Sequence, residues 1–132
     1  MDDTIFKKMK VKPGMTVATL YAPPEYPNYE EGSEVGEGKA DFVHLFVTSK
    51  HEFTERLAEA ADRVTEGGLF WISYPKSAKG QKYDINRNIL WDLAIPLNWH
   101  PVAQVSLSEE WSAMRLKPNA PGVEYERPGK KK

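Results

Sequence analysis

The chain has 132 residues, a formal net charge of −1 at pH 7 and no cysteine. Its length suits a single domain, and the lack of cysteine excludes disulfides, thiolate metal sites and cysteine nucleophiles. A near-neutral charge offers no general attraction for nucleic acid or an anionic membrane. No apolar run approaches the roughly 18 residues of a membrane span, and the charged start MDDTIFKKMK is unlike a signal peptide. We therefore expect a soluble, cytoplasmic protein that binds neither nucleic acid nor a membrane.

The first predicted strand covers residues 15–21, MTVATLY, which is rich in residues that favour strands. The next stretch, 22–39, is acidic, contains repeated prolines and glycines and lacks a helical period. We predict that 22–39 is a solvated loop.

A second strand is predicted over 41–47, DFVHLFV, because a near-continuous apolar run is typical of a strand covered on both faces. The sequence SKHE follows, in which Ser49 can cap a helix and Glu52 can reach back to its start. We expect Gly67 and Gly68 to end that helix, since glycine adopts the left-handed cap conformation without strain. Residues 69–74, LFWISY, are the third predicted strand.

A second helix is predicted after Asp84, which can cap it, and it should stop at Pro96. Two further segments, HPVAQVSL and WSAMRL, read as strands joined by a turn at 108–110, which makes an antiparallel hairpin. The stretch 118–132 is rich in proline and glycine and ends in three lysines, so we predict a flexible, basic-ended tail.

This order of elements predicts the α/β class. We expect a Rossmann-like three-layer sheet of about five strands, the first three parallel, with an antiparallel C-terminal hairpin. Residues 1–117 should form one domain that includes the acidic loop 22–39. The sequence does not define an oligomeric state.

The segments KADFVHLFV and VTEGGLFWISYPK, together with the terminal hairpin, resemble the second half of a Rossmann-like methyltransferase that uses S-adenosylmethionine, and VKPGMTVATLY resembles that family's first strand. The resemblance implies that the strand beginning at Trp111 lies between the strands 69–74 and 102–107. The family has a Gly-x-Gly loop after its first strand, where this chain has Tyr21-Ala22-Pro23-Pro24. Because prolines lack the N–H donors that such a loop supplies, we predict that no cofactor binds.

The chain also resembles, over about residues 10–117, a set of small bacterial proteins known only as a domain of unknown function. The shared marks are D-F-V-x-L-F at 41–46, W-x-x-Y-P-K at 71–76 and W-S-A-x-R-L at 111–116. This resemblance implies no particular activity.

Ligands of open parallel sheets bind beyond the carboxyl ends of the strands. Each residue that we expect near that edge has a structural interpretation as well: a solvated strand end for Lys76, a helix cap for Ser49, and packing on the hairpin for Trp111. The ligand-binding candidates are Lys76, Ser77, Ser49, Trp111, Ser112 and Arg115.

No catalytic or metal-binding residues are predicted. His44 falls in mid-strand and reads as a core residue, and the three histidines lack the spacing of metal ligands. Ser73 lacks the flanking glycines of a hydrolase elbow. We predict a non-catalytic domain that binds a protein partner or a small ligand. The alternatives are an enzyme with its site at the carboxyl ends of the strands, or a degenerate S-adenosylmethionine-binding protein.

Overall fold

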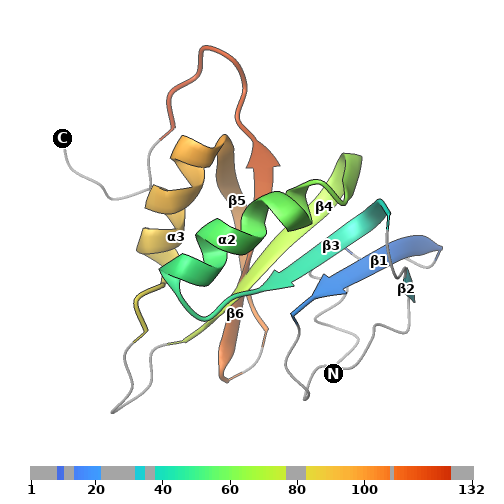
Figure 1. Cartoon of the computed structure of the whole chain (residues 1–132), viewed down its shortest axis with the longest axis horizontal. Coiled ribbons are helices and arrows are strands. Elements are labelled where there is room, and N and C mark those ends of the chain that lie inside the picture. Colours follow the sequence, from blue (N-terminus) through green and yellow to red (C-terminus); the bar gives the residue numbers. More distant parts are fainter. Residues whose placement is uncertain are drawn as a thin grey trace.

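The computed structural model describes residues 9–10, 14–21, 32–34, 38–76, 83–107 and 109–125. These residues form a six-stranded sheet in the order β2-β1-β3-β4-β6-β5 (Figure 1). The strands are β1 (Met15–Leu20), β2 (Gly32–Glu34), β3 (Ala40–Phe46), β4 (Val64–Pro75), β5 (Trp99–Ser106) and β6 (Trp111–Pro118).

The predicted arrangement of the sheet is confirmed. Strands β1, β3 and β4 are parallel neighbours, whereas β6 runs antiparallel between β4 and β5. The structure adds one strand that the sequence reading assigned to the acidic loop, the three-residue β2, which pairs parallel with β1. So short a strand carries too little pattern to be recognised from its sequence.

Helices α2 (Lys50–Ala61) and α3 (Arg87–Ala94) lie on the same face of the sheet (Figure 1). A short 3₁₀ helix (Ile95–Leu97) follows α3 directly and contains Pro96. The apolar sides of both helices meet the sheet in one hydrophobic core, whose larger buried members include Phe53, Leu57, Phe70, Ile72, Leu90, Met114 and Leu116.

The opposite face of the sheet carries a second, aromatic core. Phe42 and Phe46 of β3 and Trp71 of β4 are almost fully buried there. Within the described part of the chain no helix covers this face, and Met9 and Leu107 pack against it. The indole Nε1 of Trp71 donates to the Met9 carbonyl at 3.1 Å.

The start of α2 is as predicted, with the Ser49 hydroxyl accepting from the Glu52 amide at 3.1 Å. Its end is not, because α2 stops at Ala61, and Gly67 and Gly68 belong to β4. Strand β4 bulges there, since Val64 pairs with Ala40 but the next pair joins Leu69 to Phe42. The left-handed φ of +77° at Gly67 explains why a glycine is needed at this bulge rather than at a helix end.

The predicted cap of the second helix is also wrong. Asn86, not Asp84, caps α3, with its side chain accepting from the Ile89 amide at 2.9 Å. The Asp84 carboxylate instead accepts from the amide of Lys50 at 2.9 Å, so it joins the loop before α3 to the first turn of α2. Both residue types cap helices well, and sequence alone does not separate two caps that are two residues apart.

Residues beyond β6 contact the sheet up to the last described one. The Asn119 amide donates to the Asn98 carbonyl at 2.8 Å, and the Tyr125 ring stacks on His100 with centroids 4.0 Å apart. Residues 126–132 of the predicted tail lie outside the described part. None of the helices among the described residues combines the length and the apolar character needed to cross a membrane.

Candidate functional site: the carboxyl edge of the parallel strands

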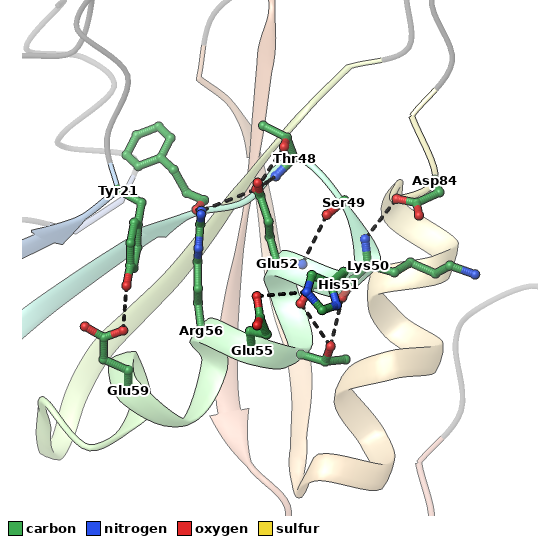
Figure 2. Close-up of polar contacts among 12 residues, drawn as sticks. Tyr21, Thr48, Ser49, Lys50, His51, Glu52, Glu55, Arg56, Glu59 and Asp84 are labelled. Atoms are coloured by element: carbon green, nitrogen blue, oxygen red, sulfur yellow. Dashed lines mark hydrogen bonds and ion pairs between the residues drawn. The ribbon is translucent and has the colours of Figure 1, made fainter.

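Tyr21 follows the last residue of β1 and occupies the carboxyl edge where ligands of such sheets bind. Its backbone has a left-handed φ of +61°, and its side chain is 50% exposed. The Arg56 guanidinium of α2 lies 3.9 Å from the centre of the Tyr21 ring, and the Tyr21 hydroxyl donates to Glu59 at 2.8 Å (Figure 2). The end of β1 is therefore tied to α2 by an aromatic stack and a hydrogen bond.

Arg56 also ties α2 to the end of β3. Its Nη1 atom donates to the Phe46 carbonyl at 3.3 Å and to Glu52 at 3.3 Å. The Glu52 carboxylate accepts from the amide and the hydroxyl of Thr48, at 2.7 and 2.8 Å. We call the linked residues Tyr21, Thr48, Glu52, Arg56 and Glu59 the Tyr21–Arg56 network (Figure 2).

The contacts of the network shift the pKa of two of its members, Tyr21 and Glu52. The hydrogen bond to Glu59, with desolvation, raises the pKa of the Tyr21 phenol above its usual 10.0, so the phenol stays a donor. Desolvation works against ionisation of Glu52, but the hydrogen bonds from Thr48 and the charge of Arg56 prevail and lower the pKa of its carboxyl. Both shifts move the group away from neutral pH, so the Tyr21 phenol stays protonated and the Glu52 carboxyl stays ionised there.

Three of the residues predicted to bind a ligand lie close together at the same edge of the sheet, where β4 ends and β6 begins. Trp111 begins β6 opposite Pro75, is 9% exposed, and packs edge-on against Phe46 with centroids 5.2 Å apart. Ser112 is buried opposite Tyr74. The Lys76 ammonium donates to the Ser106 hydroxyl at 2.6 Å, and its amide donates to the Glu110 carbonyl at 2.8 Å. Lys76 is thus held against the β5–β6 hairpin.

The remaining candidates are separated from these. Ser49 is engaged as the cap of α2. Arg115 lies well inside β6, opposite Trp71 of β4 and Ala103 of β5, about 13 Å along the strand from Trp111. Ser77 lies outside the described residues. The structure therefore brings together Lys76, Trp111 and Ser112, and places Arg115 away from them.

His44 is buried in the aromatic core, where its Nε2 atom lies 2.5 Å from the Ser73 hydroxyl oxygen. Its ring stacks on Phe46 with centroids 4.2 Å apart. Desolvation by burial lowers the pKa of His44 from 6.5 to about 3, so the imidazole is neutral at ordinary pH. This supports the interpretation of His44 as a core residue. Within the described ranges, no group of three or more His, Asp or Glu side chains is placed to hold a metal ion.

Sequence reasoning missed the Tyr21–Arg56 network. One signal was present, because Glu52 and Arg56 are four residues apart, the spacing of an ion pair along one helix face. Arg56 and Tyr21 are 35 positions apart in the sequence. A local sequence pattern cannot predict a contact between residues so far apart.

The strand order and the inserted antiparallel strand define a Rossmann-like α/β protein of the kind seen in methyltransferases. The ribosomal protein L11 methylase of Lactobacillus delbrueckii subsp. bulgaricus is similar, with a TM-score of 0.56, 9% identity, and 89% of this chain and 76% of that one covered. A protein of the NADB-Rossmann superfamily from Streptococcus agalactiae gives a TM-score of 0.54 at 8% identity, over 94% of this chain and 71% of that one. The DhpI–SAH complex is also similar, with a TM-score of 0.52 and 9% identity, and 79% of this chain and 76% of that one are covered.

No protein-family profile matches the chain, and no curated protein matches it. The structural likeness therefore establishes the fold and leaves the activity to be argued from the site. The resemblance to small bacterial proteins of unknown function stays a prediction.

Proposed function

We propose that this chain is a non-catalytic domain of methyltransferase-like fold, which binds a protein partner or a small ligand at the carboxyl edge of its sheet. The Tyr21–Arg56 network carries the proposal. At the end of the first strand, where a nucleotide-binding relative needs a glycine-rich loop with free N–H groups, this chain has a tyrosine side chain fixed beneath an arginine.

The same pair is well suited to binding. Tyrosine and arginine are enriched among the residues that dominate protein interfaces. Tyr21 keeps half of its surface exposed while Glu59 and Arg56 restrict its rotamer. A partner that covers the Tyr21 ring therefore has little side-chain entropy left to remove.

Native mass spectrometry of the protein purified from its own host tests this proposal. We expect a retained partner or ligand that is lost from Tyr21→Ala but kept by Val123→Ala, a matched control whose side chain is similarly exposed, at 51%. Retention that does not change in Tyr21→Ala would contradict the proposal.

The second candidate is residual binding of S-adenosylmethionine or its product. It is favoured by the likeness to DhpI, which was solved with SAH. Isothermal titration calorimetry separates the two functions. The first predicts no binding of S-adenosylmethionine or SAH in the micromolar range, whereas a micromolar dissociation constant for either compound would favour the second.

A further inference from the structure

In the described part of the chain, strand β5 pairs with β6 on one side and with no strand on the other, so it forms an edge of the sheet. The Leu107 amide, just beyond β5, donates to the Trp111 carbonyl at 2.9 Å. Because hydrogen-bonded pairs alternate along an antiparallel ladder, Val105 and Ala103 also exchange hydrogen bonds with β6. Gln104 lies between them and therefore directs its N–H and C=O groups toward the open side of the edge.

The second half of β5 lacks the features that usually protect a sheet edge. Native proteins protect long edge strands with charged side chains, prolines and bulges. Strand β5 has eight residues, WHPVAQVS, without Asp, Glu, Lys or Arg. Pro101 and the register shift beside Val102 interrupt only its first half. Residues 103–106 therefore form a regular, uncharged edge that is able to pair with a further strand.

A cavity of about 210 Å³ lies beside this edge, between β5 and helix α3 (Figure 1). It is smaller than the roughly 300–1,000 Å³ of small-molecule sites, so its size suits a single side chain. Trp91 and Val102 line it; Val102 is 43% exposed and Trp91 is only partly buried. The Gln104 side-chain amide, another lining group, donates to the Tyr74 hydroxyl at 3.3 Å. The cavity thus offers accessible apolar surface next to open backbone groups.

Arg87 adds a positive charge to the same cavity. It lies four residues before Trp91 in α3, so the two side chains share one face of the helix. The Arg87 Nη1 atom donates to the Asn88 side chain at 2.9 Å, and the ion pairs found among the described residues do not include Arg87. A guanidinium has five N–H donors, so Arg87 retains donors for a carboxylate.

From these observations we propose that an extended peptide segment of a partner protein adds to the sheet along residues 103–106. Its backbone pairs with the open edge of β5, an apolar side chain contacts Trp91 and Val102, and an acidic side chain binds Arg87. Strand addition of this kind takes its affinity from main-chain hydrogen bonds and its specificity from pockets for alternate side chains. Strands β4 and β6 lie between β5 and the strands of the Tyr21–Arg56 network, so this site is separate from the proposed function.

The spacing of Arg87 and Trp91 defines the peptide further. Residues four apart on a helix are separated by about 6 Å along its axis, and alternate residues of a strand by about 6.8 Å. The acidic and the apolar side chain of the peptide should therefore be separated by one residue.

The probe is a library of random 12-residue peptides displayed on phage. We expect the selected peptides to share an acidic and an apolar residue separated by one position, without proline beside them. A selected peptide is then synthesised with a fluorophore, and its affinity is measured by fluorescence anisotropy. In a ¹⁵N NMR titration, we expect it to shift the amide signal of Gln104 and to leave that of Tyr21 in place.

Two matched pairs of variants test the contacts. Arg87→Glu should weaken peptide binding about tenfold, and a peptide with lysine in place of its acidic residue should recover affinity for this variant. Lys39→Glu makes the same charge change at an exposed residue before β3 and should bind like the wild type. Gln104→Pro removes the outward N–H and should weaken binding about tenfold, whereas Gln104→Ala keeps that N–H and most of the affinity.

The proposal is overturned if the selection enriches no such peptides, or if Arg87→Glu and Lys39→Glu have equal effects. A dimer of the chain that Gln104→Pro dissociates, seen by analytical ultracentrifugation, overturns it too, because a second copy would then occupy the edge. Peptide binding that is lost in Tyr21→Ala but kept in Arg87→Glu also overturns it while supporting the proposed function, so the two hypotheses fail separately.

Discussion

The guanidinium of Arg56 stacks 3.9 Å from the ring centre of Tyr21, a residue whose backbone is held at φ +61°. A left-handed conformation is unfavourable by about 1–2 kcal/mol for a residue with a Cβ. The stack and the hydrogen bond to Glu59 offset that strain. A glycine could adopt this backbone conformation without strain. Here a tyrosine adopts it, and its side-chain contacts to Arg56 and Glu59 compensate for the strain.

This strain predicts an unusual order of stability at position 21. Both Tyr21→Gly and Tyr21→Ala lose the stack on Arg56, but only glycine adopts φ +61° freely. We expect the glycine variant to be more stable than the alanine variant by about 1 kcal/mol in urea denaturation. The reverse order would show that position 21 relaxes to another backbone conformation.

The buried His44 predicts a pH dependence of stability. Burial lowers the pKa of His44 from 6.5 to about 3 in the folded chain. Between these two pH values, His44 is protonated in the unfolded state and neutral in the folded state. The free energy of unfolding should therefore be highest above pH 6.5 and fall as the pH drops toward 3. The expected slope is about 1.4 kcal/mol per pH unit.

Urea denaturation between pH 7 and pH 5 measures this slope before most carboxyl groups begin to protonate. We expect His44→Gln, which keeps a hydrogen-bonding group near Ser73, to lose most of the slope. An unchanged slope in His44→Gln would mean that another group titrates.

Trp111 and Lys76 should differ strongly in their contribution to stability. Trp111→Ala removes a ring that is 9% exposed and packs on Phe46, and we expect it to lower the free energy of unfolding by about 3 kcal/mol. Lys76→Ala loses a partly exposed hydrogen bond to Ser106, which is worth about 0.5–1 kcal/mol. Chemical denaturation of both variants checks this, and a fully stable Trp111→Ala would make a binding role for Trp111 the better interpretation.

Two truncations should show which of the residues after β6 contribute to stability. Ending the chain after Tyr125 keeps the Asn119 hydrogen bonds to Asn98 and Ile95 and the stack of Tyr125 on His100, so we expect almost no loss of stability. Ending it after Pro118 removes these contacts, and we expect a loss of about 2 kcal/mol in urea denaturation. Equal stability of the two truncated chains would show that the contacts contribute nothing.

The strands of the sheet other than β2 could be predicted because their signals are local. The apolar runs at 41–47 and 69–74 and the turn before Trp111 each span only a few residues. The same reasoning failed at Gly67 and Gly68, because a glycine pair fits a strand bulge as well as a helix end, and only pairing with β3 decides between them.

The positions of the candidate residues could be predicted only where chain order fixes them. Lys76, Trp111 and Ser112 follow or begin strands whose pairing is implied by the fold. Tyr21 and Arg56 are in contact because the end of β1 and helix α2 lie at the same edge of the sheet. The hydrophobic periodicity of the sequence does not predict this packing.

The position of β6 between β4 and β5 has a consequence for synthesis of the protein. Until β6 has been synthesised, β4 has no partner on one side, and its apolar stretch from Phe70 to Tyr74 presents open N–H and C=O groups. The sheet can close only after Trp111–Pro118 has left the exit tunnel and inserted. We therefore expect a chain that is interrupted before Trp111 to expose this edge of β4 and to aggregate more readily than the chain that includes β6.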